Sequence, residues 1–235
     1  MDFQNRVAVV TGGTGALGSA VVLDLLEAGS YVSVAHIVES EWKELAARAE
    51  PWRTRLDGWR VDLTRPSEVE TWIKSVQSSR GRLDYLLAIA GGFAAGKVHE
   101  TSESVWDLMM KLNLRAVVGV LRPVLPLMIR QNFGRIVTVG SGTILDQPGA
   151  GIAAYAVSKA AVRQLSEVLA EEMKDYDIRV HCLMPGTMDT EANRRAMPDA
   201  DRSQWLSTGE VARVIHRLLL EGVRTPVVVP IVRGS

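Results

Sequence analysis

Short apolar runs rich in β-branched residues recur along the chain, and longer stretches with apolar residues at helical spacing separate them. Runs of the first kind are typical of buried strands, and the second pattern is typical of amphipathic helices. The pattern predicts seven strands, at residues 6–11, 31–37, 59–63, 85–90, 135–139, 178–183 and 227–232. Pro230 in the last run cannot donate to a sheet ladder, so this strand is expected at an edge or with a bulge.

Helices are predicted between these strands, at residues 16–28, 41–49, 66–78, 102–128, 153–176 and 207–221. Pro66 suits a first helical turn, whereas Pro123 and Pro126 are expected to bend or break the end of helix 102–128. The last helix opens on STGE (residues 207–210), which resembles a capping box. Strict alternation of strand and helix predicts a doubly wound, mostly parallel seven-stranded sheet with helices on both faces. A ligand crevice is then expected at the carboxyl ends of the strands.

Composition narrows the class of protein. The 235 residues fit a single domain (1–235), and 47% apolar with 23% charged residues is ordinary for a soluble globular protein. Lys+Arg and Asp+Glu are both 27, so no basic excess indicates nucleic acid. Cys182 is the only cysteine, which excludes an intrachain disulfide and fits a reducing cytosol. Without a signal-like N-terminus or a run of eighteen apolar residues, we expect a cytoplasmic protein that spans no membrane.

A glycine-rich loop, TGGTGALG, follows the first predicted strand and opens the first helix at residues 11–18. Its spacing fits G-x-G-x-x-G, in which glycines permit a tight turn and let the backbone approach a pyrophosphate at a helix N-terminus. The alternative is a tight turn with close helix packing and no ligand. We expect dinucleotide contacts from Gly12, Thr14, Gly15, Ala16, Leu17 and Gly18.

The end of the second strand bears on which dinucleotide is bound. An acid usually stands there for the ribose hydroxyls, but this chain has His36, with Glu39 slightly beyond it. A neutral imidazole can hydrogen-bond a hydroxyl, and an imidazolium attracts a 2′-phosphate. A surface histidine with neither role is the alternative, so both NAD(H) and NADP(H) stay open.

Two further strand ends carry candidate cofactor contacts. Asp62, beside Leu63, stands where an acid can accept a hydrogen bond from an adenine amino group, and a helix cap or turn residue is the alternative. Ala90, Gly91 and Gly92 follow the fourth strand. Small residues there let the backbone lie against a ribose, although an ordinary strand-end turn gives the same pattern.

Tyr155 and Lys159 are four residues apart in a predicted helix and therefore lie on the same face. A phenol has an ordinary pKa near ~10, and a fixed ammonium nearby is expected to lower it. The pair suits proton transfer on or off an alcohol oxygen. A packed tyrosine beside a solvated lysine is the alternative, because this spacing is common on helices.

The glycine-rich loop, Asp62, Asn113, Ser141, Tyr155-x-x-x-Lys159 and Pro185-Gly186 occur in an order and spacing that resemble the short-chain dehydrogenase/reductase family over essentially the whole chain. The resemblance implies a Rossmann-type fold and four catalytic residues. Tyr155 would be the general acid/base, and Lys159 would lower its pKa and hold the nicotinamide ribose. Ser141 would polarise the substrate oxygen, and Asn113 would hold the water of a proton relay.

The same resemblance implies further cofactor contacts from Pro185, Gly186, Met188 and Thr190, with Thr190 holding the carboxamide. The structural alternatives are a strand-end hydroxyl for Ser141, a satisfied helix amide for Asn113 and a helix cap for Thr190. Arg194 and Arg195 lie in the lid, where a solvated face is the alternative to a contact with an anion.

We expect a small-molecule substrate under a lid at about residues 187–207, with a pocket lined by Phe93, Ile144, Leu145 and Met188. The histidines lack metal-ligand spacing, so no catalytic metal is expected. The family also implies a homodimer or homotetramer built on helices 102–128 and 153–176. Sedimentation showing only monomer at low micromolar concentration would contradict that expectation.

Two departures from the family pattern stand out. Ala88-Ile89-Ala90-Gly91 replaces Asn-Asn-Ala-Gly, and Ala16 replaces a glycine. With GALGS, AGGFAAG and residues 188–205, they are similar to the dihydropteridine reductases, which reduce quinonoid dihydropterin with NADH. That branch has an acid where His36 stands and lacks the serine and asparagine present here. We therefore expect a carbonyl/alcohol oxidoreductase. Pterin reduction is the first alternative, and a catalytically silent NAD(P)-binding sensor is the second.

Overall fold

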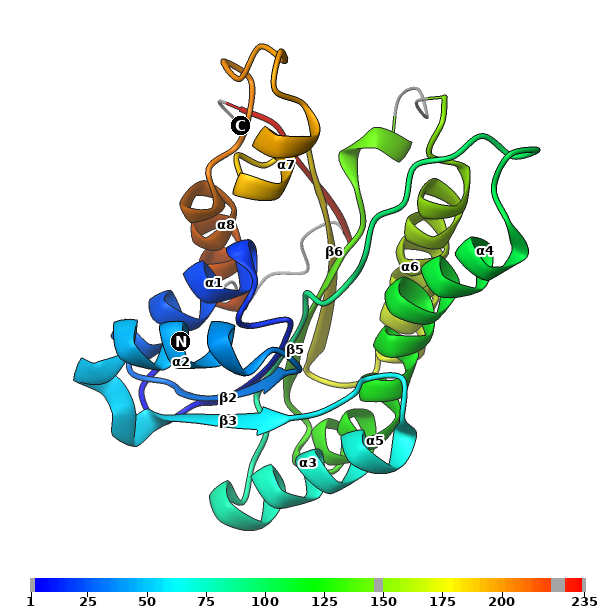
Figure 1. The fold of residues 1–235 in the computed structure, drawn as a ribbon. Helices are drawn as coiled ribbons and strands as arrows, with labels where there is room; N and C mark the ends of the chain where they lie inside the picture. The colour runs from blue at the N-terminus through cyan, green and yellow to red at the C-terminus, as the bar shows by residue number, and fades with distance from the viewer. Residues whose placement is uncertain (1–2, 146–149, 221–226, 234–235) are drawn as a thin grey trace.

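The computed structural model describes residues 3–145, 150–220 and 227–233 (Figure 1). All its strands pair in parallel in one seven-stranded sheet, in the order β3-β2-β1-β4-β5-β6-β7. The strands are β1 (Val7–Thr11), β2 (Tyr31–His36), β3 (Leu56–Arg60), β4 (Tyr85–Ala88), β5 (Gly134–Val139), β6 (Ile178–Pro185) and β7 (Val228–Ile231). The predicted doubly wound architecture is confirmed. The strand order reverses between β1 and β4, and in open α/β sheets ligands bind outside the carboxyl ends of the strands at such a point.

Helices cover both faces of the sheet (Figure 1). One face carries α1 (Ala16–Glu27), α2 (Glu39–Arg48) and α8 (Thr208–Leu220), and the other carries α3 (Pro66–Arg80), α5 (Ala116–Gln131) and α6 (Ala153–Glu172). The shorter elements are η1 (Glu50–Arg55), α4 (Glu103–Met109), the π-helical η2 (Met110–Arg115), η3 (Gly142–Ile144) and α7 (Glu191–Ala196). Each face has its own hydrophobic cluster. Along β2, for example, Val32 and Val34 point to the first cluster and Ala35 to the second.

The third strand begins three residues earlier than predicted, at Leu56 rather than residue 59, and ends at Arg60. The prediction was wrong because Asp57 and Gly58 are poor strand formers by propensity. Gly58 is nevertheless needed, since a Cβ atom at this position would lie 2.4 Å from the ring of Trp42. Packing of α2 on the sheet therefore decides the register, with Leu56 opposite Val32.

Of the bend or break predicted at Pro123 and Pro126, the break is wrong, because both prolines lie inside α5, which continues to Gln131. Pro126 is exposed, so the carbonyl group it leaves without a donor is near water. The opposite side of the helix buries Val120 and Val124 in the second cluster, which outweighs the lost hydrogen bonds.

Residues Glu103–Gln131 form a helical run that is long and apolar enough, by length and composition, to span a membrane. Its buried stripe, however, packs with α3 and the sheet in the second cluster, so it is a core helix of this α/β fold.

The predicted capping box is confirmed. The Ser207 N–H donates to Glu210 Oε2 at 2.7 Å, and the Glu210 N–H donates to Ser207 Oγ at 3.2 Å. Helix α8 follows it to Leu220, and the predicted end at residue 221 lies outside the described residues. Strand β7 lies at the sheet edge, where Pro230 was expected to be tolerated.

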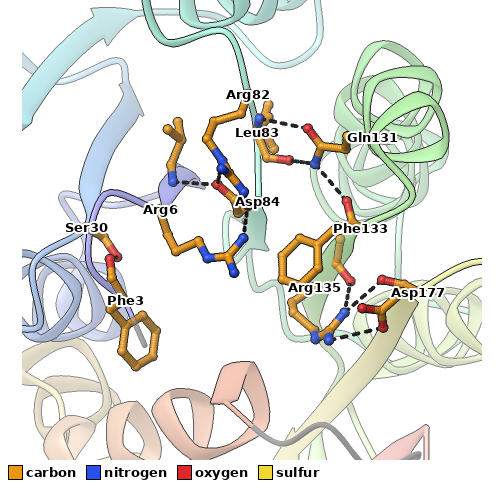
Figure 2. Close-up of polar contacts among 12 residues, drawn as sticks. Phe3, Arg6, Ser30, Arg82, Leu83, Asp84, Gln131, Phe133, Arg135 and Asp177 are labelled. Carbon is orange, nitrogen blue, oxygen red and sulfur yellow. Dashed lines mark hydrogen bonds and ion pairs between the residues drawn. The ribbon is translucent and has the colours of Figure 1, made fainter. Parts of the chain in front are cut away.

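A cluster of charged side chains lies at the amino ends of β1, β4, β5 and β6 (Figure 2). Asp84 is fully buried, and it accepts from Arg6 at 2.8 Å, from Arg82 Nε at 2.7 Å and from the Val7 N–H at 2.9 Å. Arg135 is also fully buried, and it donates to the Asp177 carbonyl at 2.8 Å and pairs with its carboxylate at 3.2 Å. These contacts join the start of β1 to the start of β4, and the start of β5 to the start of β6.

Candidate active site

The opposite end of the sheet gathers the predicted site. The glycine-rich loop leaves β1, His36 ends β2, and Gly91 follows β4. Ser141 follows β5, and Pro185 ends β6. These positions are far apart in sequence, but parallel strands bring their carboxyl ends to one edge.

Two glycines of the glycine-rich loop differ in whether the fold leaves room for a Cβ atom. Gly12 has φ +65°, and a Cβ atom there would lie 2.8 Å from the Ala90 backbone, so the fold itself requires glycine. Gly15 is different, because a Cβ atom there would meet only the Gly12 carbonyl oxygen, at 3.4 Å. Gly15 is also the N-cap residue of α1 and has no side chain to cap the helix, so the first N–H groups of the helix lack a capping acceptor. This open cradle fits the pyrophosphate of a dinucleotide.

At the end of β2, His36 is buried and stacks on Trp42, with ring centroids 5.2 Å apart and planes at 9°. Its Nδ1 has no hydrogen-bond partner among the described residues. Burial lowers the pKa of the imidazole from its ordinary value. Nearby, Thr14 of the loop donates to Glu41 of α2 at 2.8 Å, which ties the loop to that helix. His36 is therefore not a surface residue, and its contact with a dinucleotide stays a prediction.

Asp62 lies in the turn after β3, next to Leu63. Its Oδ1 accepts from the N–H and the hydroxyl of Thr64, at 2.9 and 2.7 Å, and these bonds lower its pKa. Arg65 pairs with the other carboxylate oxygen at 3.4 Å. The turn role is present, and a contact with adenine remains a prediction.

Asn113 is fully buried in the π-helical segment η2. Its Oδ1 accepts from the Gly92 N–H at 2.8 Å, and its Nδ2 donates to the Gly92 carbonyl at 3.1 Å and to Ser158 Oγ at 2.9 Å. A π-bulge shifts the side chains that follow it around the helix axis and is frequent at functional sites. The structure therefore fixes this amide beside the segment that follows β4. Its hydrogen bonds match the alternative of a satisfied helix amide.

Lys159 lies almost entirely out of water, 6% exposed, on the second turn of α6. Its ammonium donates to the Val139 carbonyl at 2.8 Å, and no carboxylate of the described residues pairs with it. Burial lowers its pKa to about 8, while Cys182 acts weakly in the opposite direction. A Cβ atom at Gly91 would lie 3.1 Å from this ammonium and 2.6 Å from Asn113 Oδ1, so β4, η2 and α6 meet here.

Ser141 and Tyr155 meet on the same side of the crevice. Ser141 is buried, contacts the Thr143 hydroxyl at 2.8 Å and hydrogen-bonds the Tyr155 side chain. Burial raises the pKa of Tyr155, and the hydrogen bond with Ser141 opposes that increase. The expectation that the pKa of this phenol would be lowered is therefore wrong for the protein alone, because desolvation of the phenolate is the larger influence.

The predicted lid leaves the sheet after Pro185 and Gly186. Met188 and Leu206 form a β-bridge at its base, so residues 187–206 return to where they started. Thr190 caps α7 by accepting from the Asn193 N–H at 3.2 Å, which is the alternative named for it. Arg194 and Arg195 pair within the lid, with Asp189 at 2.6 Å and Glu191 at 3.4 Å.

On the substrate side, Phe93 packs edge-on against Tyr155 with ring centroids 5.0 Å apart, although 62% of Phe93 is exposed. Gly96 holds this loop to the start of α6, because it bridges to Ile152 and donates to the Gly151 carbonyl at 2.6 Å. Ile144 and Leu145 are half-buried at η3.

A cavity of about 620 Å³ lies elsewhere, between α1, α8 and β7, and contains none of the predicted site residues. Asp24, Arg213, His216 and Arg217 are among its lining residues. The candidate active site is therefore the group of functional side chains at the carboxyl ends of the strands, and not this cavity.

Sequence reasoning missed three residues that support the site. Ser158 links Asn113 to the Tyr155 carbonyl, which its hydroxyl reaches at 2.7 Å. Thr143 holds Ser141, and Trp42 holds His36. The position of Ser158, between Tyr155 and Lys159, was the one available sequence signal.

Comparisons with known proteins show the family of this chain. Residues 6–201 match the family model described as short chain dehydrogenase. A 3-oxoacyl-[acyl-carrier-protein] reductase of Thermotoga maritima is 29% identical over 208 residues, which cover 88% of this chain and 83% of that protein. The chain belongs to the short-chain dehydrogenase/reductase family and is a dehydrogenase/reductase of that family.

Two solved structures share the fold. NAD⁺-bound xylitol dehydrogenase superposes with a TM-score of 0.89 over all of both chains, at 24% identity. ElxO with NADP bound gives 0.88 over 97% of both chains, at 22% identity. Proteins of this fold thus bind either dinucleotide. None of the relatives named here is a dihydropteridine reductase, so that local similarity gains no support.

Proposed function

We propose that this protein transfers a hydride between NAD(P) and a carbonyl or alcohol substrate, with Tyr155 as the general acid/base. The convergence of Tyr155, Ser141 and Lys159 at one strand edge carries this proposal. Lys159 is the key observation, because a buried ammonium without a carboxylate is costly unless a ligand uses it.

The residues at the crevice fit a dinucleotide along its length. Gly15 and the start of α1 would hold the pyrophosphate, Asp62 and Leu63 the adenine, and Ala90 with Gly91 a ribose. Pro185, Gly186, Met188 and Thr190 would flank the nicotinamide. When bound, the nicotinamide supplies or accepts the hydride.

The protein's own groups would handle the proton. In reduction, the Tyr155 hydroxyl donates its proton to the oxygen that becomes an alcohol, and in oxidation the phenolate removes it. The Ser141 hydroxyl donates a hydrogen bond to the same oxygen and polarises the carbonyl. Lys159 stabilises the phenolate by its charge, and Asn113 orders water beside it. A raised Tyr155 pKa keeps the phenol in its proton-donating form at neutral pH.

The retained Ser141 and Asn113 favour a carbonyl over a quinonoid dihydropterin, because an electron-poor pterin needs little polarisation. A catalytically silent sensor is the remaining alternative. Tight dinucleotide binding by the wild-type protein, with no turnover on a broad panel of aldehydes, ketones and alcohols, would favour the sensor.

A Tyr155→Phe variant tests the mechanism. We expect turnover on any substrate found with that panel to fall by roughly 10²- to 10⁴-fold, while dinucleotide affinity measured by titration stays within about twofold. Tyr31→Phe, at the amino end of β2, is the matched control and should keep full turnover. Comparable turnover in Tyr155→Phe and the wild type would reject Tyr155 as the acid/base.

A further inference from the structure

The segment that follows β4, residues 91–96, is anchored to the rest of the fold at both ends. The fully buried Asn113 amide accepts from the Gly92 N–H at 2.8 Å and donates to the Gly92 carbonyl at 3.1 Å. At the other end, the Gly96 N–H donates to the Gly151 carbonyl at 2.6 Å, just before α6. Only three residues lie between these two anchors, so the anchors largely set the course of their backbone.

The packing around both anchors leaves little room for a residue larger than glycine. A Cβ atom at Gly92 would lie 2.9 Å from Leu112 Cδ1, and one at Gly96 would overlap Thr101 Oγ1. Backbone that is fixed in this way holds a side chain in place before a ligand arrives, which lowers the entropy lost on binding. The segment is therefore suited to present a side chain to a ligand.

Phe93 is the one large side chain of this segment, because Ala94 and Ala95 follow it. Its ring packs edge-on against the Tyr155 ring, with centroids 5.0 Å apart and planes at 66°, yet 62% of Phe93 is exposed. A large apolar side chain that stays exposed beside a reactive hydroxyl is typical of a ligand-binding surface. One side of the ring is held by the phenol, and most of the residue is accessible to a molecule at the Tyr155 hydroxyl.

Two of the segments that border the Tyr155 side chain carry no charged group. Residues 91–96 contact it through Phe93 and contain only glycine, alanine and phenylalanine. Residues 141–145 contact it through Ser141 and contain only glycine, hydroxyl-bearing and apolar residues. Apolar walls with a few polar groups that fix orientation are typical of sites for small, largely apolar molecules. These walls fit an uncharged group on the substrate.

We propose that Phe93 is a specificity-determining residue, and that the substrate carries an aromatic ring on the carbon that bears the reacting oxygen. This inference rests on the proposed function. The substrate oxygen must lie at hydrogen-bond distance from the Tyr155 hydroxyl, about 2.7 Å, and a ring on the same carbon then lies against Phe93. An aromatic ring there pairs with Phe93 edge-to-face or offset, an interaction that a saturated ring of the same size lacks.

Turnover of acetophenone and of cyclohexyl methyl ketone tests this proposal, because the two ketones differ only in the saturation of the ring. Their intrinsic reactivities differ equally for every variant, so the ratio of the two kcat/KM values is compared between proteins. Phe93→Leu keeps an apolar side chain and should lower the acetophenone preference by roughly three- to tenfold, the size of one aromatic pair. Phe93→Tyr keeps the ring and should keep the ratio. Val98→Ala, an exposed valine beyond the anchored segment, is the matched control and should keep it too.

NMR titration of both ketones, with saturating NAD⁺ or NADP⁺, gives a second readout that needs no turnover. Acetophenone should bind to the wild type, and its affinity should fall in Phe93→Leu by the same factor. The same ratio and the same affinities in the wild type and Phe93→Leu would overturn the role of Phe93 and leave the proposed function intact. No binding of acetophenone by the wild type would overturn the substrate class. A wild type that binds acetophenone through Phe93 but turns over no carbonyl compound would overturn the proposed hydride transfer alone.

Discussion

Two buried cations, Arg135 at the amino end of the sheet and Lys159 at the carboxyl end, are held in opposite ways. Arg135 has a carboxylate partner in Asp177 and donates to two backbone carbonyls. Lys159 has one carbonyl partner, Val139, and no carboxylate among the described residues. The charge at the first end is paired within the protein, and the charge at the second end has no carboxylate partner among the described residues.

The two ends of the sheet also differ in their buried carboxylates. At the amino end Asp84 is enclosed by Arg6 and Arg82, as Figure 2 shows, and it also accepts from the Val7 N–H. At the carboxyl end the polar groups described above are the hydroxyls of Ser141 and Thr143, the Asn113 amide and the Lys159 ammonium. We infer that the amino end stabilises the fold, whereas the carboxyl end sacrifices stability for chemistry.

Removing the enclosed carboxylate should give the largest change in stability. Asp84→Ala leaves two arginines and the buried Val7 N–H without their acceptor, so we expect the free energy of unfolding to fall by about 3 kcal/mol. Urea unfolding measures it, and turnover per folded molecule should stay unchanged. Glu50→Ala, which breaks the exposed pair with Arg53, is the control and should unfold like the wild type. An Asp84→Ala variant as stable as the wild type would contradict the structural role of this end.

Removing the ammonium of Lys159 should instead raise the free energy of unfolding. A pKa lowered from 10.5 to about 8 disfavours the folded state at pH 7 by about 3 kcal/mol. Lys159→Met removes this cost but also the bond to Val139, worth about 1 kcal/mol. We therefore expect a variant about 2 kcal/mol more stable than the wild type, and without turnover.

The pH dependence gives that prediction a second readout. Between pH 8 and pH 10.5 the unfolded chain holds the Lys159 proton and the folded chain does not, so the free energy of unfolding should rise with pH in the wild type. The rise should shrink in Lys159→Met. A Lys159→Met variant less stable than the wild type at pH 7, with an unchanged pH slope, would show that the ammonium is not a cost.

A smaller effect on stability is expected at Gly91, which follows β4 at the carboxyl end of the sheet. Gly91→Ala places a methyl group 2.6 Å from Asn113 Oδ1 and 3.1 Å from Lys159 Nζ, so one of them must move. We expect a loss of about 1 kcal/mol in unfolding free energy, and a fall of about tenfold or more in turnover, since the shift lies within the site.

Gly119→Ala is the matched control for that variant. A Cβ atom there would lie 3.6 Å from its nearest neighbour, the Leu63 carbonyl oxygen. Alanine in a helix should leave turnover unchanged and raise stability by up to ~1 kcal/mol. Equal turnover in Gly91→Ala and Gly119→Ala would mean that the placement of Asn113 does not matter for the reaction.

The alternation of apolar runs and helical spacing was enough to predict the parallel sheet and the helices on both faces. The ligand crevice at the strand ends stays a prediction. Local chemistry was also readable: the capping box at residues 207–210 and the edge position of Pro230 follow from backbone donors and acceptors. The order of motifs predicted the family, and with it the residues that gather at one edge.

What the tertiary structure decided concerns groups brought together from distant positions. The start of β3 depends on Trp42 packing over Gly58, and α5 passes through two prolines because its buried face packs on the sheet. The raised pKa of Tyr155 and the lowered pKa of Lys159 both come from burial. Burial depends on every neighbour of a residue at once, so a spacing along the chain predicts which groups meet but not how much water they keep.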